Sequence, residues 1–291
     1  MGLRPGSRTR TRVWSVEGDQ GRLRPDDLAT EEPMEIRLIS QGTRQTVAVT
    51  MRTPGNDFEL AAGFLHGEGV IGSRDDVAQI GYCVDAEVDA EQQYNIINVT
   101  LRSGIEPDLA PLERHFFTTS ACGVCGKASL EALQLRNCPV IPPGPVIAAE
   151  TLYRLPERLQ AAQGLFRKTG GLHAAALFDP SGELIEIRED VGRHNALDKL
   201  VGWALLEGRV PLHDCILLVS GRTSFEILQK SVVAGLPIVC AVSAPSSLAV
   251  DLAREFGITL VGFLRGERCN VYAGRERIAT RKEEMENRSA G

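Results

Sequence analysis

The stretch CILLVSGRTSFEILQKSVVAGLPIVCAVSAPSSLAVDLAREFGITLVGFL, residues 215–264, decides the fold of this chain. It contains three short apolar runs, at 215–219, 237–242 and 258–264, separated by amphipathic segments at 225–234 and 248–256. Uninterrupted apolar strands that alternate with helices are typical of a largely parallel sheet with both faces covered. The stretch therefore predicts an α/β domain.

The residues before this stretch extend the domain. Runs at 174–178 and 184–187 predict two paired strands around an Asp-Pro-Ser-Gly turn, and helices are expected at 150–163 and 196–206. Further back, alternating segments at 34–39 and 46–51 predict a hairpin, followed by a helix at 58–65 and strands at 80–84 and 94–101. We therefore expect a small α+β domain at 33–113 and a larger α/β domain at 114–280 that includes the Cys-x-x-Cys loop.

The two ends of the chain carry little apolar sequence. Residues 1–32 contain arginines and then acids, without the apolar core of a signal peptide, so we predict a flexible tail there and a second tail at 281–291. No apolar run approaches the ~20 residues that cross a bilayer, so no membrane role is expected. Seven cysteines, five of them isolated in the sequence, favour a reducing, cytoplasmic location.

The composition excludes some kinds of partner. The chain has 291 residues, of which 43% are hydrophobic and 24% charged, the balance of a globular protein. Its net charge of −6 argues against a general nucleic-acid binder. Any anion site must therefore be a local group of arginines.

Three loops follow strands or precede helices, at 190–195, 220–224 and 243–247. In open α/β sheets such loops gather at the carboxyl ends of the strands, where ligands bind. Arg193 and Arg222 supply planar donors suited to phosphate, and Thr223 with Glu226 fits a capping box. Each loop alone is also explained as an ordinary cap or turn. Together with the turn at 265–268, they favour a phosphate-bearing ligand.

A Cys-x-x-Cys pair, Cys122 and Cys125, lies in a glycine-flanked loop at 118–127. Lys127 and a nearby helix start both favour a thiolate over a thiol. The spacing suits thiol–disulfide chemistry or a metal. A structural zinc ion needs four ligands, and no histidine lies at a spacing that completes the set, so we expect no metal unless two chains share one.

Two related site types fit the sequence less well. A zinc deaminase needs His-x-Glu before Pro-Cys-x-x-Cys, whereas here the cysteine pair comes first and His173-Ala174-Ala175 lacks the glutamate. A thioredoxin-like motif lies near a βαβ unit, whereas this loop joins two subdomains. A zinc-binding or thiol-redox module remains the alternative to the family interpretation that follows.

Five motifs resemble, in order, those of the formate dehydrogenase accessory sulfurtransferase (FdhD-type sulfur carrier) family. They are Ser-Ala-Cys-Gly-Val-Cys-Gly-Lys at 120–127, Thr-Gly-Gly-Leu-His-Ala-Ala at 169–175, Glu-Asp-Val-Gly-Arg-His-Asn-Ala-Leu-Asp-Lys at 189–199, Ser-Gly-Arg-Thr-Ser-Phe-Glu at 220–226 and Val-Gly-Phe-Leu-Arg-Gly-Glu-Arg-Cys-Asn-Val-Tyr at 261–272. The resemblance covers about residues 33–280, and the motif at 189–199 is very specific.

This resemblance implies a sulfur carrier. Such proteins take sulfur as a persulfide from a cysteine desulfurase and pass it to the molybdenum cofactor that formate dehydrogenase requires. It also implies a cytidine-deaminase-like domain joined to a small domain, a homodimer, and binding of the bis-guanine-dinucleotide form of the cofactor. By matching position, Cys122 resembles the persulfide carrier and Cys125 its partner or resolving thiol.

The remaining site residues follow from the motifs and the loops together. The segment that resembles the cofactor-contacting stretch is Phe263, Leu264, Arg265, Gly266, Glu267 and Arg268, and the loop residues Ser220, Gly221, Arg222 and His194 join it. His173 and His194 have either a ligand or proton-transfer role or a structural one. Cys269 is a candidate auxiliary thiol, whereas the other isolated cysteines, 83, 138, 215 and 240, are expected in the core.

Overall fold

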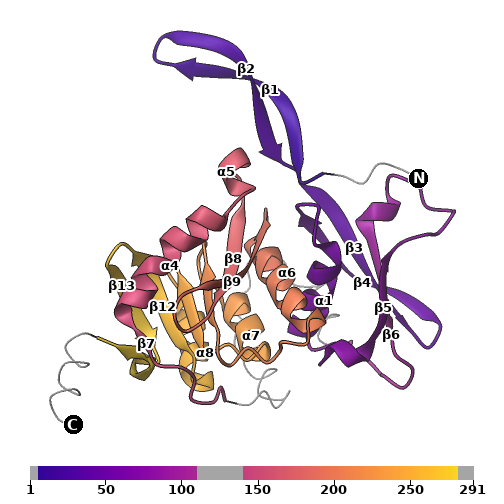
Figure 1. Ribbon diagram of the computed structural model, residues 1–291. Helices are drawn as coiled ribbons and strands as arrows, with labels where there is room; N and C mark the ends of the chain where they lie inside the picture. The colour runs from indigo at the N-terminus through magenta and orange to yellow at the C-terminus, as the bar shows by residue number, and fades with distance from the viewer. Residues whose placement is uncertain (1–5, 110–139, 281–291) are drawn as a thin grey trace.

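The computed structural model describes residues 6–109 and 140–280. Figure 1 shows three parts within these residues: a long hairpin that projects from the body, a four-stranded sheet and a six-stranded sheet. None of the helices in these residues is long and apolar enough to cross a membrane.

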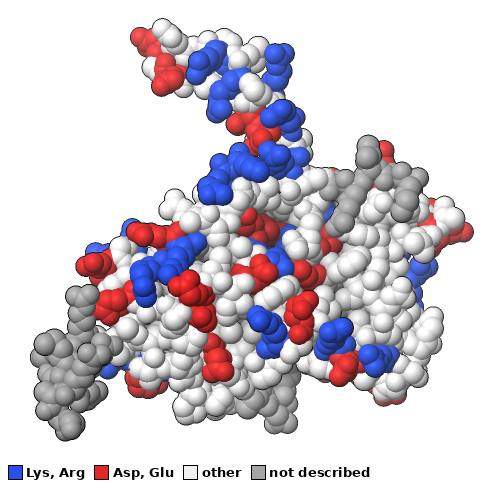
Figure 2. All heavy atoms as spheres, viewed as in Figure 1, with Lys and Arg blue, Asp and Glu red and all other residues white. Residues whose placement is uncertain are grey.

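The projecting hairpin consists of β1 (Arg8–Glu17) and β2 (Gln20–Ala29), paired antiparallel along their full length. The prediction of a flexible tail at 1–32 is therefore wrong for this segment. The two strands are held together by cross-strand pairs such as Trp14 with Leu23, and by an ion pair of 2.7 Å between Arg8 and Asp27. The pattern of charges in the sequence does not reveal these contacts. Arginine side chains lie along the hairpin (Figure 2).

The four-stranded sheet has the order β4-β3-β6-β5. Its elements are β3 (Glu32–Ser40), β4 (Thr43–Arg52), α1 (Asp57–Gly67), β5 (Val77–Tyr82) and β6 (Ile96–Leu101), with short 3-10 turns η1 (Arg74–Asp76) and η2 (Gln93–Asn95). The predicted hairpin, helix and two further strands are confirmed, with ends shifted by a few residues. The core of this part lies between the sheet and α1, where Met34, Ile36 and Leu60 are almost fully buried.

The six-stranded sheet has the order β13-β12-β11-β10-β8-β9. Its strands are β8 (His173–Phe178), β9 (Leu184–Asp190), β10 (Ile216–Val219), β11 (Ile238–Ala241), β12 (Thr259–Arg265) and β13 (Arg268–Ala273). The helices are α4 (Ala149–Ala162), α5 (Phe166–Thr169), α6 (Arg193–Leu206), α7 (Phe225–Val233) and α8 (Ser247–Phe256). A separate parallel pair joins β7 (Ile147–Ala148) to β14 (Ile278–Ala279), just after the 3-10 turn η3 (Arg275–Arg277).

The α/β class is confirmed, but the sheet is mixed rather than largely parallel. Only β10–β11 and β11–β12 pair in parallel, and the other three pairings are antiparallel. Short turns explain two of the three antiparallel pairings: Gly182 lies in the tight turn between β8 and β9, and Gly266 in the one between β12 and β13. A connection this short can only return the chain antiparallel.

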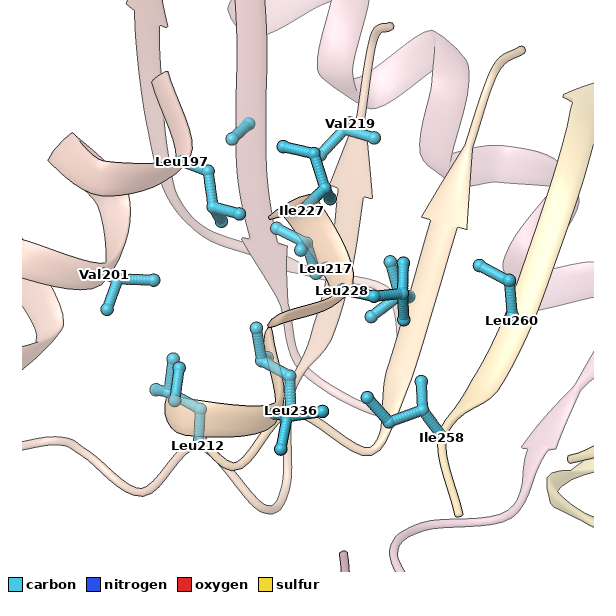
Figure 3. Packing of buried hydrophobic residues seen from close by; sticks show 14 of the residues in the cluster. Leu197, Val201, Leu212, Leu217, Val219, Ile227, Leu228, Leu236, Ile258 and Leu260 are labelled. Carbon is cyan, nitrogen blue, oxygen red and sulfur yellow. The ribbon is translucent and has the colours of Figure 1, made fainter. Parts of the chain in front are cut away.

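Helices cover both faces of this sheet, as predicted. On one face, side chains of α6, α7 and α8 meet those of the strands in one apolar layer; Figure 3 shows Leu197 and Val201 of α6 near Ile227 and Leu228 of α7 and Leu217 of β10. On the other face, α4 packs its leucines against Ala176, Phe178 and Leu218.

The two sheets are joined by the crossing of α1 and α6. At this crossing two glycines face the backbone of the opposite helix: a Cβ on Gly63 would lie 1.8 Å from the carbonyl oxygen of Asp198, and one on Gly202 would lie 1.8 Å from that of Glu59. A methyl group cannot fit at such a distance. The close contact therefore fixes α6, and with it the loop that begins the helix, against the small sheet.

Candidate functional site

The loops that follow the parallel strands meet where those strands end, at the carboxyl-terminal side of the large sheet, which we call its carboxyl edge. Thr223, after β10, donates its backbone N–H to the carbonyl of Ala244 over 3.2 Å and forms a parallel bridge with Pro245. Phe263, near the end of β12, donates its N–H to the carbonyl of Ser243 over 3.1 Å. The structure thus brings together the loops 220–224 and 243–247 and the 263–268 segment.

The loop that begins α6 joins this group through its histidine and arginine. Nε2 of His194 lies 3.1 Å from the hydroxyl of Ser224 and 3.0 Å from a carboxylate oxygen of Glu226. A Cβ added to Gly221 would lie 3.3 Å from Nδ1 of His173 and 3.7 Å from Cδ of Arg193. Gly221 therefore leaves a close approach to both side chains that a larger residue would fill.

Two residues of the predicted site have structural roles. The hydroxyl of Ser220 accepts the backbone N–H of Ala174 over 2.9 Å, and so links β10 to β8. Leu264 is fully buried among the core residues on the α4 face of the sheet. Its side chain, unlike those of its neighbours, therefore belongs to the core and does not reach the edge.

The remaining residues of the 263–268 segment form an exposed turn. Phe263 has a positive φ of 53°, and a bulge interrupts the pairing of β12 with β13 beside it. Beyond it, Arg265, Gly266, Glu267 and Arg268 are all exposed. The guanidinium of Arg265 lies 6.0 Å from the centre of the Phe263 ring.

Three arginines at this edge have donors without acceptors among the described residues. Arg222 is exposed and forms no hydrogen bond or ion pair with the described residues. Nε of Arg193 is buried and has no hydrogen-bond partner among the residues that the structure describes. Arg265 likewise has a ring contact but no ion pair with any residue the structure describes. These groups are available for an anionic ligand.

Both histidines are held neutral at pH 7. Burial lowers the pKa of His194 to about 4, with a smaller opposing effect from Glu226 and a further lowering by Arg193. Burial also lowers the pKa of His173, reinforced by the positive charge of Arg193. Each ring can therefore donate one N–H and accept at its other nitrogen.

The predicted capping box is wrong. The helix α7 has Ser224, not Thr223, at its N-cap, and no side chain caps it. Thr223 is instead fully buried, with no partner for its hydroxyl in the described parts of the chain. Glu226 pairs with His194 rather than with its own helix start.

The structure describes four of the seven cysteines. Cys122 and Cys125 lie outside the described residues, as does Cys138. Cys83 and Cys240 are buried as predicted, whereas Cys215 and Cys269 are half-buried. Burial raises the thiol pKa of Cys215, Cys240 and Cys269, so none of these three is a thiolate at neutral pH.

The sequence prediction missed a buried ionic network beneath the loop at 190–195. Nζ of Lys199 lies 2.7 Å from Asp190 and donates to the carbonyl of Thr53 over 2.8 Å. Asp190 also accepts N–H groups from Thr53 and Gly192, over 3.1 and 2.8 Å. The available signal was a set of polar residues at positions 195, 198 and 199, two of them charged, on an otherwise apolar helix face.

A second buried network begins at the neighbouring residue of α6, Asp198. Nζ of Lys230 lies 2.8 Å from Asp198 and 3.7 Å from Glu68. All three residues are less than 10% exposed. Across the described residues, no group of three or more His, Cys, Asp or Glu side chains is arranged to hold a metal ion.

Comparison with known proteins gives a consistent result. The model of the FdhD/NarQ family matches residues 29–279. The sulfur carrier protein FdhD of Streptomyces avermitilis is 55% identical over 94% of this chain and 96% of its own length. The protein of the same name from Mycobacterium tuberculosis is 52% identical over 92% of this chain and 97% of its own.

One solved structure supports the fold. It is a crystal structure from Desulfotalea psychrophila, described as a formate dehydrogenase accessory protein, with a TM-score of 0.70 and 24% identity. The match covers 94% of this chain and 99% of that one.

Proposed function

Because this chain belongs to the FdhD/NarQ family of sulfur carrier proteins involved in formate dehydrogenase maturation, we propose that it carries sulfur as a persulfide on Cys122. The sulfur comes from a cysteine desulfurase and goes to the molybdenum cofactor in its bis-guanine-dinucleotide form. The observation that carries the proposal is the family match over residues 29–279, which includes both cysteines of the pair.

Loading needs one nucleophilic thiolate. The thiolate of Cys122 attacks the outer sulfur of a persulfide on the desulfurase, a new S–S bond forms, and the old one breaks with its electron pair returning to the desulfurase cysteine. Lys127 favours the thiolate form of the pair. Three of the isolated cysteines are poor alternatives, because burial raises the pKa of Cys215, Cys240 and Cys269.

Delivery uses the second thiol. Cys125 attacks the inner sulfur of the Cys122 persulfide, so that a Cys122–Cys125 disulfide forms and the outer sulfur leaves as hydrosulfide toward the acceptor. A dithiol reductant then restores both thiols. On this scheme Cys125→Ala still loads sulfur on Cys122 but delivers it more slowly.

The acceptor is a substrate with phosphate groups, and the carboxyl edge of the large sheet suits it. Arg193, Arg222 and Arg265 have donors there without acceptors in residues 6–109 and 140–280, and Gly221 and Gly266 leave the backbone open. Each charge-assisted bond to phosphate contributes about 1.5–3 kcal/mol. We place the pyrophosphates of the acceptor at this edge.

The protein is further proposed to act in the cytoplasm as a homodimer. Sedimentation of the pure protein at micromolar concentration tests the dimer, and a monomer there would remove it.

The decisive experiment is the intact mass of the protein after incubation with a cysteine desulfurase and cysteine. We expect a gain of one sulfur atom that is lost on reduction, in the native chain and in Cys269→Ala, but not in Cys122→Ala. A zinc or simple thiol-redox module would instead show bound metal, or a disulfide without added sulfur. Full maturation of formate dehydrogenase by Cys122→Ala would refute the carrier assignment.

A further inference from the structure

The β1–β2 hairpin leaves the body of the protein beside the carboxyl edge of the large sheet. Strand β8 begins at this edge, because it runs antiparallel to β10 with Ala175 opposite Val219. Just before β8, a Cβ on Gly171 would lie 3.8 Å from the Cβ of Ala29, the last residue of β2, and β2 also lies against α5. From this base the hairpin extends away from both sheets (Figure 1). A molecule bound to the hairpin would therefore lie next to the arginines of the edge.

The two faces of the hairpin differ in charge. Residues opposite one another in an antiparallel pair share a face, and alternate residues along each strand do the same. One face, which we call the arginine–tryptophan face, therefore carries Arg8, Arg10, Arg12, Trp14 and Val16 of β1, and Gly21, Leu23, Pro25, Asp27 and Ala29 of β2. It has three arginines and one acid. The opposite face has two arginines, at 22 and 24, and two acids, at 17 and 26, so its charges cancel.

The outer end of the arginine–tryptophan face is apolar and open to solvent. Trp14, Val16 and Leu23 are exposed by 63, 67 and 62%. The indole of Trp14 lies over Gly21, where a Cβ would be 2.4 Å from the ring. An isolated two-stranded hairpin is only marginally stable in water, and adjacent exposed apolar side chains with polar neighbours mark interaction sites. The hairpin thus has the features of a docking arm.

The arginines beside the apolar end have charge that the hairpin itself does not neutralise. Arg8 and Arg10 share the carboxylate of Asp27, at 2.7 and 3.4 Å. Arg12 is exposed and forms no hydrogen bond or ion pair with the described residues. Alternate residues of a strand are about 7 Å apart, so Arg12 lies about that far from Trp14 along β1. A complementary partner has an apolar pocket for the indole and a carboxylate at a similar distance from it.

This chemistry favours a protein partner over a nucleic acid or a lipid surface. Tryptophan and arginine are the side chains that most often dominate the binding energy of protein interfaces. A phosphate backbone or an anionic bilayer is instead bound by an excess of cations. Residues 8–29 contain four acids beside their five arginines, and the whole chain has a net charge of −6.

The position of the hairpin distinguishes between the protein partners. The carboxyl edge is where the proposed function places the phosphates of the molybdenum cofactor. The protein that receives the cofactor has to approach this edge, whereas the desulfurase has to reach Cys122. A docking arm next to the edge therefore suits the recipient.

We propose that the arginine–tryptophan face docks cofactor-free formate dehydrogenase through an acidic surface of that enzyme with an apolar pocket for Trp14. The inference rests on the proposed function, because it takes the cofactor to be bound at the carboxyl edge. Docking on the hairpin brings the empty cofactor site of the dehydrogenase to this edge, so that the cofactor passes from one protein to the other within a complex.

The test is biolayer interferometry with purified, cofactor-free formate dehydrogenase on the sensor and the full chain in solution. Trp14→Ser should bind about thirty-fold or more weakly, because it removes the side chain expected at the centre of the interface. Arg12→Glu should bind about ten-fold or more weakly, and added salt should weaken binding by the native chain. Arg22→Glu is the matched control. It reverses an exposed arginine on the opposite face and should bind like the native chain.

Sulfur loading separates this proposal from the proposed function. After incubation with a cysteine desulfurase and cysteine, Trp14→Ser and Arg12→Glu should gain sulfur as the native chain does. Failure of loading in the native chain, with docking as expected, would refute the carrier function and leave the docking surface in place. Absence of binding by the native chain at micromolar concentration, or native affinity in both variants, would overturn the docking proposal.

Three further results would assign the arginine–tryptophan face to another occupant and so overturn the proposal. Conversion of a dimer to a monomer by Trp14→Ser in sedimentation would assign the face to a second copy of the chain. Binding of RNA by the native chain that both variants lose would assign it to nucleic acid. The same loss with vesicles that contain phosphatidylserine would assign it to a lipid surface.

Discussion

Replacing Lys199 with methionine tests whether the ionic network under the α6 loop holds the two sheets together. Lys199 is 2% exposed and Asp190 0%, with 2.7 Å between their charged groups. Lys199 also donates to the carbonyl of Thr53, which follows β4 in the small sheet. Methionine fills a similar volume, so the main change is the loss of the charge and its donors.

The expected loss of stability follows from what remains buried. In Lys199→Met the carboxylate of Asp190 keeps the N–H groups of Thr53 and Gly192 but has no counter-charge in its place. Breaking a buried ion pair on one side costs about 3–5 kcal/mol. For a chain of this size that corresponds to a fall in Tm of about 6–20 °C.

Urea unfolding followed by circular dichroism measures the effect. Lys168→Met, which removes an exposed lysine from α5, is the matched control and should stay within about 0.5 kcal/mol of the native value. Asp190→Asn should lose a comparable amount of stability, because it leaves the buried Lys199 ammonium without its carboxylate partner. A loss below about 1 kcal/mol for Lys199→Met would show that the pair contributes little, and the reasoning would be wrong.

Other outcomes follow from the same geometry. In a guanosine diphosphate titration, Arg222→Ala and Arg265→Ala should each bind the nucleotide about ten- to hundred-fold more weakly. Added salt should also weaken binding by the native protein. Unchanged affinity in both variants would place the phosphates elsewhere. Because the pKa of His194 falls from 6.5 to about 4 on folding, its stabilising contribution is complete above pH 6.5 and is lost as the pH drops toward 4. His194→Gln should therefore show a shallower decline in urea midpoint over that range, and an identical decline would assign the effect to other groups. Gly63→Ala should lower the Tm sharply, because the added Cβ would collide with the α6 backbone. Gly164→Ala, with open space around the added Cβ, should leave the Tm unchanged. Equal Tm values for the two variants would mean that the helices separate at little cost.

The regular elements could be predicted because their periodicity is local. The helix at 150–163 matches α4 within one residue at each end, and the hairpin at 34–51 matches β3 and β4. The β1–β2 hairpin escaped prediction because its strands carry so many arginines and acids. Its apolar residues, Trp14, Val16 and Leu23, are exposed at 62–67%, so no burial pattern marks them as strand.

Pairing direction and buried charge depended on contacts distant in sequence. The apolar run 174–178 does not indicate the neighbours of β8. In the structure β8 lies between β9 and β10 and is antiparallel to both. Likewise, Asp198 and Lys230 read as ordinary polar positions of two helices, and only the packing of α6 on α1 and α7 places them together in a closed space. The arginines of the edge were predictable because they follow strand ends, a feature the sequence carries directly.

Two surfaces of opposite electrostatic character adjoin at His194. On one side Arg193 and Arg222 favour anions, and on the other the carboxylates of Glu226 and Asp198 disfavour them. A protonated His194 would neutralise Glu226, while adding repulsion toward Arg193. Burial prevents this above about pH 4, which keeps the difference between the two surfaces constant at neutral pH.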